Sequence, residues 1–228
     1  MSRIALAIEM SQRHGSIAVG DNRGVQQSRA FASAGSNDED TLMPAIDDLV
    51  RAAALTPQDL GAIIVSIGPG GFTGLRVAVT TAKLLAECLA IPLVGVPSAL
   101  VAAAAASNSG PRIVALASKR DSSWFSVVEG DGASVRLRGT PQVVDATSAF
   151  KFFSDVRTLL ADEYVPEPIV DLARRAGVLL EVPRFEAEAC LDVGLAMLGR
   201  EELADSAQLT PIYPREPEAV TLWRERHG

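Results

Sequence analysis

The sequence is poor in the residues that build metal sites and nucleophile-based catalytic sites. Its 228 residues include two histidines, His14 and His227, and two cysteines, Cys88 and Cys190. This pair of histidines cannot form the paired-histidine helix motif of a zinc enzyme. Any serine–histidine or cysteine–histidine unit would have to use His14, and no nucleophile-elbow sequence lies near it. We therefore expect no metal, no cofactor and no histidine-dependent catalysis.

The sequence also lacks a run of basic residues and a long apolar run. The net charge is -7, whereas a protein that grips a nucleic-acid backbone alone presents a basic face. Direct, tight RNA binding is therefore disfavoured, although a partner subunit could bind RNA. No window of about 18 residues is free of polar side chains, so a membrane span is not expected. Arg3 and Glu9 interrupt the apolar start, which predicts a first strand rather than a signal peptide, and hence a cytoplasmic protein.

The first half alternates strand and helix patterns after a strand-rich opening. Short apolar runs separated by turn residues predict the strands, and apolar residues at helical spacing predict the helices. Thr73 and Ser98 are suitable caps for the helices that follow them. The expected strands are 3–8, 15–20, 25–31, 62–67 and 92–96, and the expected helices are 41–54, 74–90 and 98–106, with a loop at 32–40.

The second half opens with the same pattern as the first. Residues 112–132 read as strand, polar turn, strand and glycine turn, which matches residues 3–24 at an offset near 109. Repetition of a strand-rich α/β unit predicts two α/β domains of related design, the architecture of actin/hexokinase-like (ASKHA, ribonuclease H-like) folds. We place the domains at 1–107 and 108–228, with a hinge at 107–111. Further elements are expected as a strand at 135–144 and helices at 147–161 and 187–199.

Residues 66–76, SIGPGGFTGLR, form a glycine-rich loop between an apolar strand and a helix. Such a loop can direct main-chain N–H groups at a phosphate. However, a Walker A loop needs Lys followed by Ser or Thr, and Gly74 is followed by Leu75 and Arg76. The dinucleotide fingerprint would need glycine at position 73, which is Thr73. The alternative interpretation, a tight corner that lets helix and strand pack closely, is favoured.

The helix after this loop is apolar around most of its circumference. Its polar side chains, Arg76, Thr80, Lys83 and Glu87, form one narrow stripe. A helix of this kind must be covered on two sides. The sheet of its own domain would cover one side, and either the helix at 41–54 or another chain would cover the other. The pattern alone leaves both interpretations open. Trp124 and Tyr213 are expected in the core.

Several segments together resemble the bacterial TsaB (YeaZ) family. They are AIEMS…GSIAV near the start, PAIDDLVRAAALTPQDLGAIIV, SIGPGGFTGLRVAVTTAKLLAECLAIPLVGVPSA, and DSAQLTPIYPR near the end. The resemblance is close over the first 107 residues and loose afterwards. It implies the two-domain actin/hexokinase-like fold, and a non-catalytic relative of TsaD, the metal-bearing subunit that attaches threonylcarbamoyl to adenosine in tRNA.

The resemblance also implies partners and an interface. It implies pairing with a TsaD-like catalytic subunit, a TsaE-like ATPase in the same complex, tRNA bound only through that complex, and a homodimer when alone. The interface would be a helix bundle of the first two long helices, here 41–54 and 74–90. The residues expected there are Leu42, Ile46, Leu49, Val50, Val77, Ala78, Ala82, Leu85 and Ala86.

The chain departs from the family pattern at three places, of which the smallest is Gly71 where the glycine loop of the family typically has serine. Glu9-Met10-Ser11 stands where most members have Asp-Thr-Ser, and Asn37 to Thr41 replace a His-Ser-Glu stretch. Phosphoryl-transferring members of the fold use a carboxylate on the first strand of each half to hold Mg²⁺-nucleotide. The second half has Ala117 or Ser118 at that point. A structural role for Glu9 is favoured, and the alternative is an independent peptidase or nucleotide hydrolase, with nucleotide contacts at Glu9, Ser11, Gly68, Gly70 and Gly71.

Overall fold

The computed structural model describes residues 3–32, 42–215, 223 and 226. Most of the loop predicted at 32–40, the departure at 37–41 and most of the C-terminal tail lie outside the described residues. Among the described residues, no helix has both the length and the apolar character that crossing a membrane requires.

The first sheet has five strands in the order β3-β2-β1-β4-β5. The first three form an antiparallel meander, and β4 and β5 run parallel to β1. Parallel strands need crossover connections, and helices supply them here. The strands are β1 (Ile4–Glu9), β2 (His14–Asp21), β3 (Gly24–Ala32), β4 (Leu60–Ser66) and β5 (Leu93–Val96); the intervening helices are α1 (Leu42–Ala52), the 3₁₀ turn η1 (Pro57–Asp59) and α2 (Phe72–Leu89).

The second sheet repeats this topology. Its order is β11-β10-β6-β7-β8, with β6, β7 and β8 antiparallel and β10 and β11 parallel to β6. The repetition confirms the prediction of two related α/β halves of actin/hexokinase-like design. The strands are β6 (Arg112–Lys119), β7 (Ser122–Glu129), β8 (Arg136–Leu137), β9 (Gln142–Asp145, paired with β7), β10 (Thr158–Ala161) and β11 (Leu179–Glu181); the helices are η2 (Gly132–Ser134), α4 (Ala146–Ala149), η3 (Phe150–Phe152) and α5 (Glu167–Arg175).

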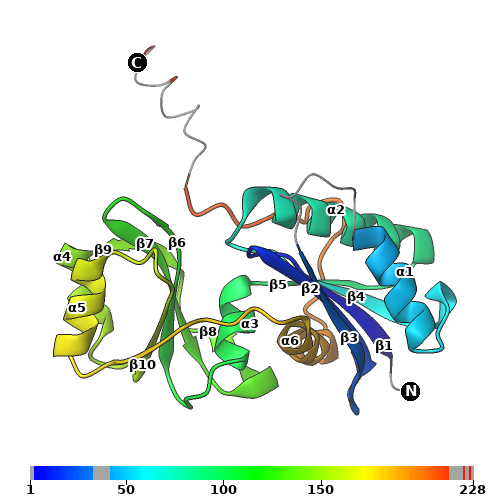
Figure 1. Cartoon of the computed structure of the whole chain (residues 1–228), viewed down its shortest axis with the longest axis horizontal. Helices are drawn as coiled ribbons and strands as arrows, with labels where there is room; N and C mark the ends of the chain where they lie inside the picture. The colour runs from blue at the N-terminus through cyan, green and yellow to red at the C-terminus, as the bar shows by residue number, and fades with distance from the viewer. Residues whose placement is uncertain (1–2, 33–41, 216–222, 224–225, 227–228) are drawn as a thin grey trace.

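The elements stack in alternating helical and sheet layers (Figure 1). Helices α1 and α2 cover the outer face of the first sheet, and α4 and α5 cover the outer face of the second. Helices α3 (Ser98–Ala104) and α6 (Ala187–Gly199) lie between the sheets. Their apolar side chains share one buried cluster with residues of both sheets, so the two halves have a common core.

Helix α6 belongs to the first sheet in its packing, although it follows the second sheet in the chain. It contacts β1, β2, β4 and β5. A Cβ atom on Gly194 would lie 2.3 Å from Cγ2 of Ile64, so only glycine allows this approach to β4. The division predicted at residue 107 falls between the two sheets, but residues 187–199 of the second segment return to pack on the first.

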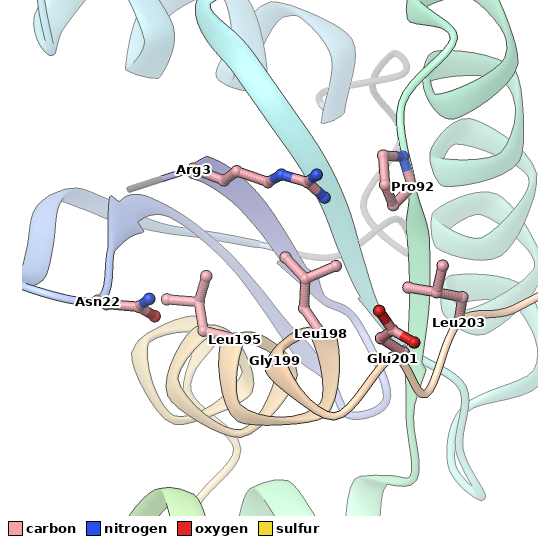
Figure 2. Close-up of a pocket in the computed structure, with 8 residues that line it drawn as sticks. All are labelled: Arg3, Asn22, Pro92, Leu195, Leu198, Gly199, Glu201 and Leu203. Carbon is pink, nitrogen blue, oxygen red and sulfur yellow. The ribbon is translucent and has the colours of Figure 1, made fainter. Parts of the chain in front are cut away.

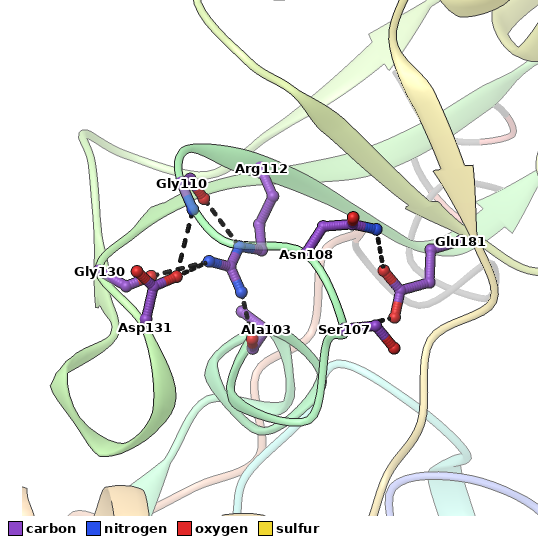
Figure 3. A network of polar contacts seen from close by, with 8 residues as sticks. All are labelled: Ala103, Ser107, Asn108, Gly110, Arg112, Gly130, Asp131 and Glu181. Carbon is purple, nitrogen blue, oxygen red and sulfur yellow. Dashed lines mark hydrogen bonds and ion pairs between the residues drawn. The ribbon is translucent and has the colours of Figure 1, made fainter.

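The segment predicted as a hinge, 107–111, is fixed by hydrogen bonds (Figure 3). The Ser107 amide and the Asn108 side chain donate to the two carboxylate oxygens of Glu181, at 2.7 and 3.0 Å. The buried guanidinium of Arg112 donates to the carbonyl oxygens of Ala103, Gly110 and Gly130 and to Asp131. This network connects α3, the linker and the β7–η2 turn.

Four local predictions were wrong. Helix α2 begins at Phe72 with Gly71 as its N-cap, so Thr73 lies in its first turn, and Pro97 rather than Ser98 precedes α3. The strand predicted at 135–144 is divided into β8 and β9. The helix predicted at 147–161 ends after a few residues, and Thr158–Ala161 forms β10 instead, because this short apolar run completes the sheet beside β6.

Candidate functional site

Glu9 ends β1 and is completely buried. Its Oε1 atom accepts a hydrogen bond of 2.6 Å from the Ser11 amide. Within the described residues, Oε2 of Glu9 and the Ser11 hydroxyl have no hydrogen-bond partner. Burial raises the pKa of the Glu9 carboxyl, because the ionised form loses its hydration, and the bond from the Ser11 amide partly opposes this rise.

The glycine loop packs directly onto the main chain of Met10 and Ser11. The Gly71 amide donates a 2.7 Å hydrogen bond to the Ser11 carbonyl oxygen. A Cβ atom on Gly70 would lie 2.0 Å from that oxygen, and one on Gly74 would lie 2.6 Å from the Met10 carbonyl oxygen. The absence of side chains therefore lets the start of α2 approach the turn after β1, which is a corner function.

The structure brings the predicted nucleotide residues together, but it uses several of their polar groups internally. Glu9, Ser11, Gly70 and Gly71 are neighbours in the contacts above. The Gly68 carbonyl oxygen accepts a 2.8 Å bond from the Ser98 amide at the start of α3. These bonds fix the loop to β1 and α3.

The corresponding region of the second half carries hydroxyls and an arginine from the C-terminal segment. The Ser118 and Ser123 hydroxyls lie 2.7 Å apart in a hydrogen bond. The Arg215 guanidinium donates to the Ala117 carbonyl oxygen and, at 3.0 Å, to the Ser122 hydroxyl. In addition, Arg13, in the turn after β1, donates to the Tyr164 hydroxyl at 3.0 Å. Contacts between distant parts of the chain thus hold the turns after β1 and β6.

The helix surface predicted to bind a partner is mostly core. Helices α1 and α2 pack against β1, β2 and β4 with the apolar sides on which the prediction was based. Seven of the nine side chains named as partner contacts are buried against the chain's own sheet: Leu42, Ile46, Leu49, Val50, Ala78, Ala82 and Ala86. Val77 and Leu85 are partly exposed.

The outer side of the same two helices is exposed and partly apolar. Met43 is exposed on α1 and Leu84 on α2, and Thr80 and the partly exposed Val77 lie about one and two helical turns before Leu84 on the same side of α2. Met43 and Leu84 were not among the contact residues predicted from the sequence, because apolar residues at helical spacing were all assigned to one surface. Their positions out of phase with the buried residues were the available signal.

The polar stripe of α2 binds the chain's own C-terminal segment, residues 204–213. Arg76 donates to the Tyr213 hydroxyl at 3.1 Å, Lys83 to the Leu209 carbonyl oxygen at 3.2 Å, and Glu87 accepts from the Ser206 hydroxyl at 2.8 Å. The Arg76 guanidinium also lies 3.6 Å from the centre of the Phe72 ring. Tyr213 and Trp124 are not in the core as predicted, since Tyr213 is exposed and Trp124 is partly buried.

A separate cavity of about 740 Å³ lies at the other end of β1 (Figure 2). Figure 2 shows Leu195 and Leu198 of α6 beneath Arg3, with Glu201 beyond the end of the helix. Arg3 precedes β1 and Glu9 ends it, so the cavity is distinct from the glycine-loop region. None of the contact or nucleotide-binding residues predicted from the sequence is in its lining. Among the described residues, no group of three histidine, cysteine or acidic side chains is placed to hold a metal ion.

Comparisons with known proteins identify relatives whose names refer to the biosynthesis of threonylcarbamoyladenosine in tRNA. The family model described as "TsaD: tRNA N6-adenosine threonylcarbamoyltransferase" matches residues 32–206. The tRNA threonylcarbamoyladenosine biosynthesis protein TsaB of Bacillus subtilis is 48% identical over 56 residues, which are 25% of this chain and 24% of that protein. The protein of the same name from Escherichia coli is 26% identical over 199 residues, covering 82% and 83% of the two chains.

Solved structures show the same fold. YeaZ from Pseudomonas aeruginosa superposes with a TM-score of 0.74, covering 92% of this chain and 99% of that one at 20% sequence identity. The similarity extends over both halves of the chain, so both halves share the architecture of that protein.

Proposed function

The chain belongs to the TsaB (YeaZ) family, and on that premise we propose that it is a non-catalytic subunit of the system that forms threonylcarbamoyladenosine in tRNA. In this proposal it binds a TsaD-like catalytic subunit and supports its active form, within a complex that also contains a TsaE-like ATPase. The chain contacts tRNA only through that complex and forms a homodimer when alone. The names of the relatives support the assignment of the chain to this process.

The proposal that the subunit is non-catalytic is supported by the structural role of its glycine loop. The Gly71 amide is bonded to the Ser11 carbonyl oxygen, and Gly70 fits only because it lacks a side chain. The loop thus fixes the start of α2 to β1 and holds this helix in place. A rigidly held helix is a suitable element for a partner surface.

The proposed interface rests on one observation, the exposed apolar side of α1 and α2. Met43 and Leu84 present large apolar side chains to solvent, flanked by Thr80 and Val77. The C-terminal segment binds the Arg76, Lys83 and Glu87 side of α2, which leaves the Leu84 side to a partner. Covering these side chains with a partner would remove apolar surface from water, which favours association. We place the partner on this side rather than on the buried residues named from the sequence.

A co-purification experiment tests this assignment. The tagged chain and the cognate TsaD-like protein are produced together, and the amount of TsaD-like protein retained is measured. Leu84→Glu is expected to abolish retention, because a carboxylate at the contact would lose its hydration. Phe150→Glu is the matched control, since Leu84 and Phe150 are 58% and 65% exposed and lie in different halves. Retention by folded Leu84→Glu, or equal loss with both variants, would exclude this surface.

A further inference from the structure

Strand β11 forms an open edge of the second sheet. Among the described residues it pairs with one strand, β10. The Leu179 amide donates to the Arg157 carbonyl oxygen at 2.9 Å, toward β10. Successive residues of a strand direct their main-chain groups to opposite sides, so the N–H and C=O of Leu180 point away from β10. They are available to a further strand.

The side chains of this edge do not protect it. Natural edge strands are usually guarded by charges, prolines or covering segments. Here Leu180 and Val182 are 40% and 70% exposed. The one charged residue of β11, Glu181, is bonded through both carboxylate oxygens to Ser107 and Asn108 of the linker (Figure 3). Its side chain therefore does not extend over the open edge.

A groove of about 280 Å³ lies beside this edge, between β11 and α5. Val165, Val170, Leu180 and Val182 supply apolar lining. Leu180 pairs in register with Leu159, whose side chain is in the core beneath α5, so Leu180 and Val182 share the face on which α5 packs. An added strand could therefore place alternate side chains in the groove.

The groove is acidic. Its lining residues include three acidic ones beside the edge, Asp162, Glu163 and Glu167, against one basic residue, Arg174, whereas the Glu181 carboxylate is bonded to the linker. Arg174 already bonds Glu167 at 2.7 Å and Asp171, outside the groove, at 3.0 Å. Partial burial raises the pKa of Asp162, and the negative charge of Glu163 adds to this effect. A positively charged side chain near Asp162 would stabilise its carboxylate, and so would offset the effects of burial and of Glu163 on the pKa of Asp162.

We propose that β11 and this groove bind an extended, basic segment of a partner protein, which adds to the second sheet as a strand. The segment alternates β-branched residues, which enter the groove, with lysine or arginine, which pair with the acidic rim. A second copy of this chain is a poorer occupant, because symmetric pairing would bring two acidic rims together. Strand addition of this kind draws affinity from main-chain bonds and specificity from alternate side chains.

Fluorescence anisotropy with the full chain tests the proposal. The probe is a labelled heptapeptide of alternating lysine and valine, and its matched partner has glutamate in place of lysine. We expect saturable binding of the lysine peptide with a Kd below about 1 mM, and at least tenfold weaker binding of the glutamate peptide. Equal binding of both peptides, or no binding of either, would overturn the proposal.

Two variants localise the site. Leu180→Pro removes the outward N–H while keeping the Leu179 bond to β10, and it should weaken lysine-peptide binding at least tenfold. Glu163→Lys should weaken lysine-peptide binding several-fold without changing the strand. This variant tests the site if the proline variant fails to fold. Asp121→Lys, the same charge change at the β6–β7 turn, is the control and should leave Kd unchanged.

Sedimentation of the same proteins examines the competing occupant. If the chain dimerises and Leu180→Pro abolishes the dimer, the edge is a contact between copies and the proposal of a basic partner segment is wrong. Unchanged sedimentation of Leu180→Pro, with loss of peptide binding, supports it.

Discussion

The Gly71 amide and the Ser11 carbonyl oxygen are joined by a hydrogen bond of 2.7 Å, between the start of α2 and the turn after β1. This bond supports the interpretation of the glycine loop as a corner, because it fixes the start of α2 to the turn after β1. The neighbouring Gly70 has no room for a side chain at the same oxygen, whereas Gly71 has.

Gly70→Ala should lower the free energy of unfolding by about 3 kcal/mol, because the added carbon would lie 2.0 Å from main-chain oxygen and one of the two segments must move. Gly71→Ala is the control. Its φ of -63° suits alanine and its Cβ atom would lie 3.8 Å from the nearest atom, so a change within about 0.5 kcal/mol is expected. Urea denaturation measures the free energy of unfolding of both variants. Equal losses would refute the interpretation of the glycine loop as a tight corner.

Ala82→Glu should unfold the chain rather than merely prevent partner binding. Ala82 is fully buried against the first sheet, and an unpaired carboxylate there should cost more than about 4 kcal/mol. Leu84→Glu, two residues away on the exposed side, should change stability by less than about 1 kcal/mol. Thermal denaturation followed by circular dichroism measures both. A stable Ala82→Glu variant would mean that α2 is displaced from the sheet in solution.

Glu9→Gln should remove a pH-dependent loss of stability. The folded-state pKa of Glu9 is raised above 4.5, so the folded state binds its proton more tightly than the unfolded state. The contribution of the protonated Glu9 carboxyl to the free energy of unfolding is fully present below pH 4.5. It is lost as pH rises through the folded-state pKa, by about 1.4 kcal/mol per pH unit. The variant should therefore match the wild type near pH 4 and exceed it at pH 7. Denaturation curves across this range that stay parallel would contradict the prediction.

Arg112→Met should destabilise the chain by about 3 kcal/mol. The side chain is 2% exposed, and its removal leaves the carbonyl oxygens of Ala103, Gly110 and Gly130 without this donor. Arg136→Met is the control, because Arg136 is 74% exposed in its pair with Glu129. It should cost less than about 0.5 kcal/mol. Guanidinium denaturation measures both changes, and similar values would show that the linker network contributes little.

The sequence sufficed for the elements with strong local patterns. The first three strands, α1, β4, α2, β5 and α6 appear where periodicity and turn residues predicted them. The duplication was visible because the strand–turn–strand pattern at 3–24 recurs at 112–132. Elements of the second half that depend on distant partners were missed: β10 and β11 are stabilised by pairing with β6 and with each other.

The candidate interface shows the limit of pattern reading in another way. Apolar spacing predicted both helices but could not tell which side of each meets the sheet, because both sides of α2 carry apolar residues. The residues named as contacts were therefore buried ones such as Ala78, while Leu84 was missed. The polar stripe Arg76, Lys83 and Glu87 likewise gave no sign that residues 204–213 bind it.

The return of α6 to the first sheet has a consequence for synthesis on the ribosome. Strands β1, β2 and β4 are complete by residue 66, but the helix that covers one of their faces comes from residues 187–199. Until those residues emerge, the alanine-rich face of the nascent sheet, which also carries Ile64, stays exposed and prone to aggregation. The first half thus acquires its finished core only after the second has been translated, so a fragment ending near residue 107 should not be a stable folding unit.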